Sequence, residues 1–226
     1  MTDVRGTKAG LLAAVSRGRF GLRGRRTRVV GLRNSAEPDP ASAERTRVHQ
    51  AFLGRVVAYL CADAGIRQFV DWGCPVPGTA ERIRAAAPEA SVVHIAPAGT
   101  SGVLSAADTA VVAADGAGVP AQLDELTARG LLDLDEPVAV LMTRPFAAGE
   151  PPEGIADLYR AMRGGGYLVL SAAVPHRELV RALGPFAPVD PGAADITWWP
   201  YPDEDVSARG SGTLGALGRA PARRPR

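Results

Sequence analysis

Hydrophobic and polar positions follow two different periods along this chain, and segments of the two kinds alternate. Short apolar runs bounded by glycine, proline or acidic residues predict strands, and segments with apolar residues three or four apart predict helices. The strands are expected at residues 69–70, 91–95, 110–114, 137–142, 167–171 and 195–199. The helices are expected at residues 41–64, 79–87, 121–129, 155–163 and 176–183, with a weak helix or a loop at 99–109.

The run at residues 137–142 helps to decide the fold class. It is apolar throughout, as a strand covered on both faces would be. Strands that alternate with helices along the chain favour a parallel sheet with helices on both of its faces. We therefore predict an α/β fold with a Rossmann-like, doubly wound and mostly parallel sheet.

The two ends of the chain differ from its middle in composition. Residues 1–40 contain repeated glycines among arginines, and residues 207–226 are rich in Gly, Ala and Arg. Neither end shows a strong apolar period. We predict one domain over residues 41–206, a flexible basic segment before it, and a disordered Arg-rich tail after it.

Charge is distributed unevenly between these parts. Of the 26 Lys and Arg residues, nine lie in residues 1–34 and five in residues 207–226. The remaining 12 face 23 acidic residues in residues 35–206, which gives that part a net charge of about −11. An acidic domain is a poor platform for nucleic acid, so we expect no specific nucleic-acid partner. The basic ends could contact phosphates or an acidic membrane, although solvated arginine is the commoner outcome.

Several protein classes are disfavoured by what the sequence lacks. Cys61 and Cys74 are the only cysteines, too few for a disulfide framework or a zinc site. No apolar run reaches the length of a membrane span, and residues 10–15 are too short and too Arg-flanked for a secretory signal. The sequence shows no metal-ligand cluster, no serine–histidine pair and no phosphate-binding lysine loop. We expect a cytoplasmic protein without a metal site.

Each of the three histidines has an ordinary structural interpretation. His49 falls on the first predicted helix, where a surface or capping position is expected. His94 lies inside the second strand and is expected to be buried or half-buried. His176 begins a helix nearer the predicted ligand-binding edge, which makes it a better candidate for acid–base chemistry.

Residues 68–78 are the most informative stretch. An apolar run ends in Asp71 and Gly73, a turn rich in proline and glycine follows, and a helix begins near Thr79. Strand, tight turn and helix open many nucleotide-binding domains, because glycine lets the backbone approach a ligand and the helix N-terminus offers unpaired N–H groups. A plain strand-to-helix turn is the other interpretation of these residues.

Several segments taken together resemble a family of S-adenosylmethionine-dependent methyltransferases that is abundant in actinobacteria. They are AFL (51–53), VAYL (57–60), GIRQFVD (65–71), APEASVV (87–93), LLDLDEPVA (131–139) and GYLVLS (166–171). Their order and spacing extend over residues 48–202. The resemblance implies a class I methyltransferase-like domain with S-adenosylmethionine at the carboxyl ends of its first three strands.

The resemblance also implies cofactor-binding roles for individual residues. Asp71 and Gly73 match the start of the family's cofactor loop, and Cys74 follows them directly. Pro77 matches the proline of that loop. Asp115 matches the acid after the third strand, which in such enzymes lies near the adenine.

Two positions depart from the family pattern. Pro75 stands where the family has a second glycine, and Ala96 stands where it has an acid for the ribose hydroxyls. An apolar residue leaves those hydroxyls without a charged acceptor, a loss of roughly 1–3 kcal/mol. Both departures bear on whether S-adenosylmethionine is bound.

Two groups of residues are candidates for a pocket that holds the methyl acceptor. Thr143, Arg144 and Phe146 follow the fourth strand and would face such a pocket, or would belong to a surface loop that caps the sheet. Trp198 and Trp199 could wall a pocket for an aromatic acceptor. Packing of a terminal strand and a contact in a homodimer are equally open for these two tryptophans.

Two functions of different class stay open on the sequence alone. One is a methyltransferase acting on a small molecule of specialised metabolism, which the matching loop residues favour. The other is a degenerate methyltransferase-fold protein, a pseudoenzyme that binds a partner or a ligand, or a repurposed enzyme that needs no methyl donor. Pro75, a cofactor loop shorter than the family's by a few residues, and the missing ribose acid at Ala96 favour this second function.

Overall fold

The computed structural model describes residues 39–74, 76, 78–97, 110–114, 118–206 and 208–223. The basic segment predicted at residues 1–40 and the weak helix or loop predicted at 99–109 fall largely or wholly outside these ranges. Within the described helices, none is long and apolar enough to cross a membrane.

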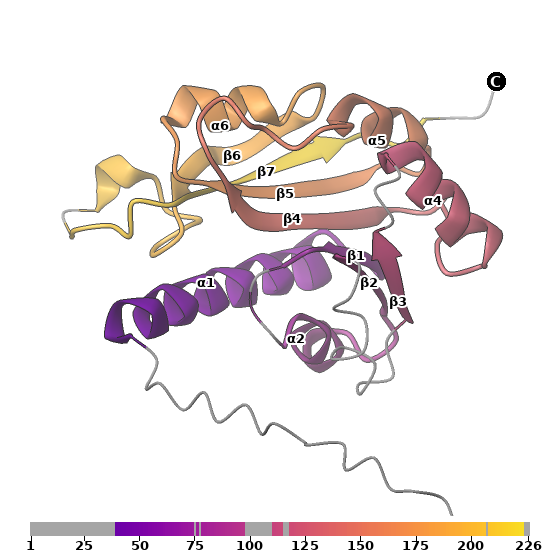
Figure 1. The fold of residues 1–226 in the computed structure, drawn as a ribbon, viewed down its shortest axis with the longest axis horizontal. Coiled ribbons are helices and arrows are strands. Elements are labelled where there is room, and N and C mark those ends of the chain that lie inside the picture. The colour runs from indigo at the N-terminus through magenta and orange to yellow at the C-terminus, as the bar shows by residue number, and fades with distance from the viewer. Residues whose placement is uncertain are drawn as a thin grey trace, which may run out of the picture. The chain divides into compact units, whose positions relative to one another are not determined.

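A seven-stranded sheet forms the centre of the fold (Figure 1). Its strands are β1 (Gln68–Trp72), β2 (Ser91–Pro97), β3 (Ala110–Ala114), β4 (Val138–Phe146), β5 (Gly166–Ala172), β6 (Ala187–Asp195) and β7 (Leu214–Ala220), in the order β3-β2-β1-β4-β5-β7-β6. Strands β1 to β5 pair in parallel, and β7 is antiparallel to both of its neighbours. The predicted α/β, doubly wound and mostly parallel sheet is confirmed.

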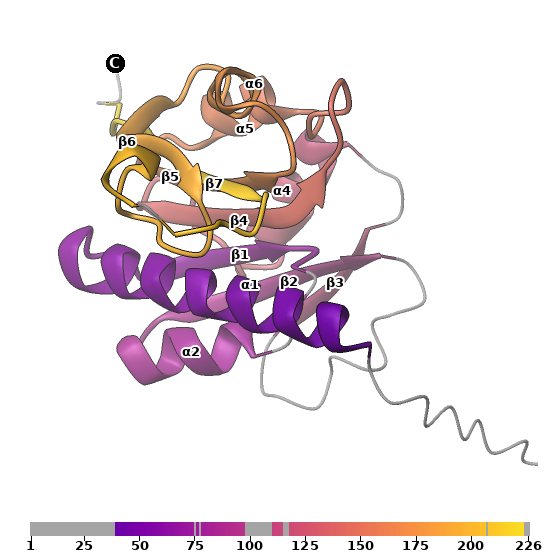
Figure 2. The same cartoon turned by 90° about the vertical axis from the view of Figure 1, so that its left-hand side faces the viewer.

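Helices cover both faces of this sheet. They are α1 (Pro40–Ala58), which continues into a π-helical turn at Tyr59–Asp63, α2 (Thr79–Ala86), α4 (Val119–Ala128), α5 (Ile155–Ala161) and α6 (His176–Ala182). Figures 1 and 2 show α1 and α2 on one face, and α4, α5 and α6 on the other. A short 3₁₀ helix, Asp203–Asp205, lies between β6 and β7 along the chain. We refer below to the α1/α2 face and the α4/α5 face.

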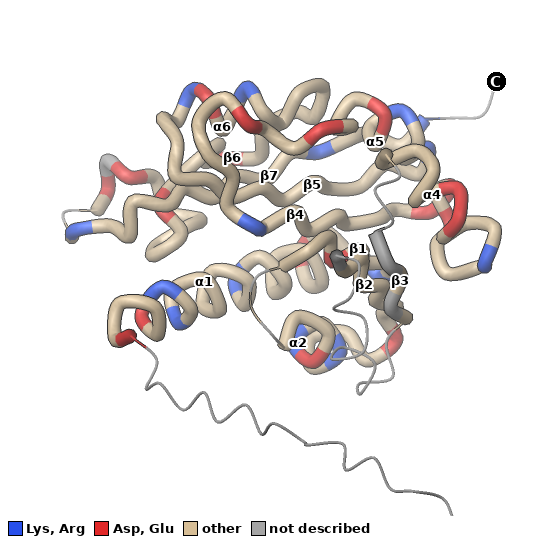
Figure 3. The backbone as a smooth tube through the Cα atoms, in the orientation of Figure 1, with Lys and Arg blue, Asp and Glu red and all other residues tan. Residues whose placement is uncertain are grey.

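The alternation of side chains along each strand explains the two layers of core. In β1, Phe69 packs into the cluster beneath α1 and α2, and its neighbour Val70 packs into the cluster beneath α4, α5 and α6. In β4, residues 138–141 are all fully buried, as expected for a central strand covered on both faces. Charged residues lie mainly on helices and loops (Figure 3), and most positions in the middle of the sheet are apolar.

The prediction of a disordered tail over residues 207–226 is wrong. Residues 214–220 form β7, which is inserted between β5 and β6 and paired along its length with β5. The glycines that suggested disorder are there because larger residues would not fit. A Cβ at Gly215 would lie 2.5 Å from Phe52 Cζ, and one at Gly218 would lie 2.6 Å from Phe186 Cβ.

The closing strand was also expected in the wrong place. The sequence predicts a strand at residues 195–199. In the structure, β6 ends at Asp195 and the residues that follow it form turns. Asp195 fixes this turn, because its carboxylate accepts hydrogen bonds from the backbone N–H groups of Thr197 and Gly212 and from the Ser211 hydroxyl. Several bonds to one buried carboxylate hold the connection to β7 in a defined shape.

Candidate functional site

The order of the strands marks one place in the sheet where a ligand can enter. The chain runs from β1 outward to β3 and then returns to place β4 on the other side of β1. In open α/β sheets, the crevice at the carboxyl ends of the strands next to such a reversal is where ligands bind. The residues at this point are Trp72, at the end of β1, and Met142 to Phe146, at the end of β4.

Asp71 organises the turn that follows β1. Its side chain is 2% exposed, its Oδ1 accepts a hydrogen bond from the Cys74 backbone N–H at 3.0 Å, and its Oδ2 lies 3.0 Å from His94 Nδ1 on β2. The register places Asp71 directly beside His94 in the sheet. The carboxylate therefore ties the turn to the neighbouring strand, and both of its oxygens already have partners inside the protein.

Gly73 allows this turn to open towards solvent or a ligand. Its φ is +71°, a conformation that L side chains rarely adopt, and a Cβ built there would meet no atom within 4 Å. Its own N–H donates to the Ile95 carbonyl at 3.0 Å. Helix α2 then begins after Gly78, which has no side chain to cap the first N–H groups of the helix.

A cluster of buried polar side chains lies near this turn on the α1/α2 face. Thr143 is fully buried, and its hydroxyl donates to Cys74 Sγ at 3.4 Å. The backbone carbonyl of Thr143 accepts a 2.7 Å hydrogen bond from the buried Ser171 hydroxyl. Burial raises the pKa of the Cys74 thiol, and the Asp71 carboxylate raises it further. Thr143 and Ser171 in this polar cluster are closed to solvent, and Cys74 is partly exposed.

His49 belongs to the same buried region, so its predicted surface or capping position is wrong. The side chain of His49 is 5% exposed, and its Nε2 has no hydrogen-bond partner among the described residues. Burial lowers the pKa of His49 to about 4, and the Asp71 carboxylate offsets part of that shift. His94 is half-buried as predicted, and His176 is exposed at the start of α6.

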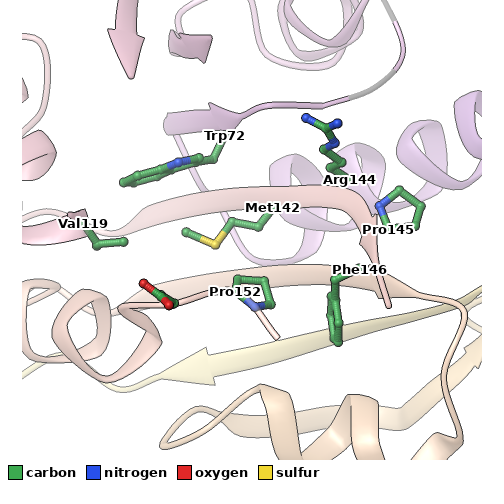
Figure 4. A pocket seen from close by; sticks show the side chains of 8 residues that line it. Trp72, Val119, Met142, Arg144, Pro145, Phe146 and Pro152 are labelled. Atoms are coloured by element: carbon green, nitrogen blue, oxygen red, sulfur yellow. The ribbon is translucent and has the colours of Figure 1, made fainter. Parts of the chain in front are cut away.

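A pocket opens on the α4/α5 side of the same edge (Figure 4). Its volume is about 350 Å³, near the lower end of the range for small-molecule sites. Most of its wall is apolar or aromatic, and two charged residues complete it. The lining residues are Trp72, Val119, Met142, Arg144, Pro145, Phe146, Pro152 and Glu153.

The candidates after the fourth strand are divided between this pocket and the core. Arg144 and Phe146 line the pocket. Thr143 does not, because side chains alternate along β4 and its hydroxyl faces Cys74 on the opposite side of the sheet. The expectation that all three residues face one pocket is therefore wrong for Thr143.

Trp198 and Trp199 do not line this pocket. Trp199 is 1% exposed and packs edge-to-face on Phe52, with ring centroids 5.7 Å apart. The Trp198 indole N–H donates to Asp203 Oδ1 at 2.8 Å. The guanidinium of Arg55 on α1 donates to the backbone carbonyls of Ile196 and Thr197. The segment therefore has the packing role that was the alternative to an acceptor wall.

Some of the candidate cofactor-binding residues lie outside the described residues. Pro77 and Asp115, like Pro75, are outside the described residues. Ala96, where the family pattern has an acid, is 2% exposed near the end of β2. Among the described residues, no group of three or more His, Cys, Asp or Glu side chains is arranged to hold a metal ion.

Sequence reasoning missed several residues of the pocket. Trp72 was available from the pattern, because it stands between Asp71 and Gly73 and must point to the face opposite Asp71. Met142 could have been found in the same way, as the neighbour of Thr143 along β4. Val119 and the Pro152–Glu153 segment had no such indication, since only the folded chain brings α4 and the loop before α5 to this edge.

Comparisons with known proteins agree with this geometry. The chain is similar over 80% of its length to a DUF574 family protein of Streptomyces avermitilis, with 23% identity, a TM-score of 0.55 and 89% of that chain covered. It is similar over 81% of its length to a candidate methyltransferase of Thermobifida fusca, with 23% identity, a TM-score of 0.63 and 84% of that chain covered. These similarities show the fold.

The family itself is shown by sequence. No curated protein matches the chain. Residues 30–184, more than half of the chain, match the family described as S-adenosyl methyltransferase. The chain therefore belongs to the S-adenosyl methyltransferase family, and its fold is similar to that of the two solved structures.

Proposed function

We propose that this protein transfers the methyl group of S-adenosylmethionine to a small molecule with an apolar body. One observation carries the proposal beyond family membership: Trp72 ends β1 directly before Gly73 of the turn, and it also lines the 350 Å³ pocket. A ligand held by the turn would therefore lie next to a ligand held by the pocket. Adjacent sites for donor and acceptor are what a group-transfer enzyme requires.

The residues around the turn fit the methionyl end of the cofactor. The open space beside Gly73 gives a ligand access to the backbone, and the first N–H groups of α2 suit a carboxylate. The ribose hydroxyls would have fewer hydrogen-bond partners, because β2 has Ala96 at the position where a carboxylate would accept from them. We assign the main contacts of the protein to the methionyl end.

The chemistry of the step places few demands on the pocket. The bound cofactor would supply a methyl group already activated for transfer to a nucleophile. The chain's own task is to orient the acceptor and to keep the reacting atoms apart from water. Apolar side chains such as Met142 and Phe146 can do both, and Glu153 is the one carboxylate among the described lining residues.

A matched pair of glycine variants tests cofactor binding. Gly73 and Gly130 have φ values of +71° and +65°, and a Cβ at either position meets nothing within 4 Å. Gly73→Ala and Gly130→Ala should therefore lose similar stability, about 1 kcal/mol each, by the same backbone strain. Only Gly73→Ala puts a methyl group into the proposed site, so only that variant should lose affinity for S-adenosylhomocysteine.

Isothermal titration calorimetry with S-adenosylmethionine and S-adenosylhomocysteine gives the readout. We expect at least a tenfold weaker binding in Gly73→Ala, a difference of about 1.4 kcal/mol, and unchanged binding in Gly130→Ala. Equal affinity in the two variants would remove the turn from the site. A wild-type protein that binds neither compound would favour the partner-binding, non-methylating alternative.

A further inference from the structure

Two residues of opposite charge, Arg144 and Glu153, line the pocket without a partner among the described residues. Arg144 follows the buried part of β4, and Glu153 lies in the loop before α5. Neither side chain forms a hydrogen bond or an ion pair with another of the residues that the structure describes. They also do not pair with each other within 4.0 Å, although they line the same pocket. Charges held apart over one cavity leave room for a ligand between them.

The rest of the lining favours a flat, apolar body for that ligand. Trp72 and Phe146 contribute aromatic surfaces, and Met142 contributes a polarisable thioether between them. Figure 4 shows Trp72 and Arg144 on one side of the strand that carries Met142, and Pro152 and Phe146 on the other. The two charged residues come from different segments, β4 and the loop before α5, and the other six lining residues are apolar or aromatic.

We propose that the pocket binds a small aromatic molecule with two polar ends, an anionic group held by Arg144 and a cationic or hydrogen-bond-donating group held by Glu153. The planar guanidinium of arginine matches a carboxylate with two parallel hydrogen bonds. A carboxylate accepts equally well from an ammonium or a hydroxyl group. The identification of this ligand as the methyl acceptor rests on the proposed function. The binding of such a ligand to the pocket does not depend on that function.

Exposure to water limits how much each charge can contribute to the affinity for a ligand. Arg144 and Glu153 are exposed in the free protein, where an ion pair is weak because water screens it. A ring seated on Trp72 and Phe146 would exclude part of that water from both pairs. We therefore expect each charge to raise affinity by about tenfold, the low end for a charge-assisted contact.

Four probes that share one benzene ring separate these contributions: para-(aminomethyl)benzoate, benzoate, benzylamine and benzyl alcohol. Binding to the full chain is followed by ligand-observed NMR or calorimetry, without any cofactor. The amphoteric compound should bind most tightly and benzyl alcohol most weakly. Arg144→Gln should abolish the advantage given by the carboxylate, and Glu153→Gln the advantage given by the ammonium group.

Controls keep the outcomes distinct. Arg181→Gln, which removes a charge from the last turn of α6 outside the pocket lining, should change none of the four affinities. Equal binding of all four probes, no binding of any, or the same ranking in Arg144→Gln and Glu153→Gln as in the wild type would overturn the inference. A parallel titration with S-adenosylhomocysteine separates the two proposals, because cofactor binding without probe binding contradicts only this one.

Discussion

The two faces of the sheet differ in polarity and in exposure at the carboxyl ends of β1 and β4. On the α1/α2 face, the ends of the strands carry polar side chains, including Asp71, Thr143 and Ser171, and all of these are buried. On the α4/α5 face, the same strand ends carry Trp72, Met142 and Arg144 around an open pocket. One face is polar and closed, and the other is mostly apolar and open.

This difference separates groups that hold the site from groups that meet a ligand. Buried polar groups are costly unless they are paired, and here they are paired mainly with one another and with the turn after β1. The exposed charges of the pocket have no described partner, so they are available to a ligand. A polar residue near a ligand-binding edge is therefore not evidence of ligand contact by itself.

Consecutive residues of one strand have their side chains on opposite faces of the sheet. Asp71 and Trp72 are consecutive, as are Thr143 and Arg144, and each pair is split between the two faces by the alternation of the strand. Substitutions at these positions can therefore test the two faces separately.

The largest effect is expected from Asp71→Ala on the closed face. The substitution leaves the partly buried Cys74 N–H and His94 ring without their carboxylate partner. Each buried group left unpaired costs about 1–3 kcal/mol, so the free energy of unfolding should fall by about 2–5 kcal/mol. For a domain of this size that is a Tm lower by roughly 5–15 °C in a thermal melt.

Asp135→Ala is the control for this substitution. Asp135 also pairs with a basic side chain, Arg163, but the pair is exposed to solvent. It should shift Tm far less than Asp71→Ala, because water replaces the lost partner. Similar shifts for both variants would show that the Asp71 contacts are no more important than a surface pair.

A pH dependence should follow from the burial of His49. Burial lowers the pKa of His49 from its ordinary value of 6.5 to about 4. Between these values the unfolded chain binds a proton at this residue and the folded chain does not, so stability must fall as pH falls through this window. The full loss from this residue is about 3 kcal/mol, reached near pH 4.

Denaturant titrations of the wild type and His49→Gln across this window measure the contribution. The glutamine variant should show a shallower fall in the free energy of unfolding, because the slope from the buried imidazole is gone. The slope that both proteins share comes from other groups and cancels in the difference. Parallel curves for the two proteins would mean that His49 can be protonated without disturbing the fold.

Much of the sheet could be predicted from the sequence because its strands are apolar and its helices have a clear period. Strand β7 could not, because its small residues carry little hydrophobic pattern. Gly215 and Gly218 are small since aromatic residues of α1 and of the segment before β6 occupy the space above them. Close packing of this kind is decided by partners distant in the sequence, which composition cannot reveal.

The site was predictable where local chemistry decides it and not where packing does. Asp71 and Gly73 stand out because an acid and a glycine after an apolar strand have few other uses. Trp198 and Trp199 are candidates on the sequence because aromatic residues are rare in this chain, but rarity does not say which face of the fold a side chain lies on. The predicted homodimer contact, which the structure of one chain does not test, stays a prediction.

A smaller effect is expected from Thr143→Val, which keeps the shape of the side chain and removes its hydroxyl. The loss should be about 0.5–1 kcal/mol of unfolding free energy, since one weak buried contact to Cys74 Sγ disappears. The Thr143 hydroxyl also opposes the increase in the pKa of the Cys74 thiol, so that pKa should rise further in the variant. In a Cys61→Ala background, Cys74 should then react more slowly with a disulfide reagent at a given pH. An unchanged pH profile of that reaction would contradict the contact.

The smallest effect on stability is expected on the open face, from Arg144→Gln and Glu153→Gln. Both side chains are exposed and have no described partner, so each variant should unfold within about 0.5 kcal/mol of the wild type. Arg55→Gln is the contrasting variant, because the guanidinium of Arg55 donates to backbone carbonyls near Trp199 and its loss should destabilise the fold. Urea titrations of the three variants give the comparison. If Arg144→Gln or Glu153→Gln destabilised the protein as much as Arg55→Gln, these charges would be holding the fold, and they would not be free to bind a ligand.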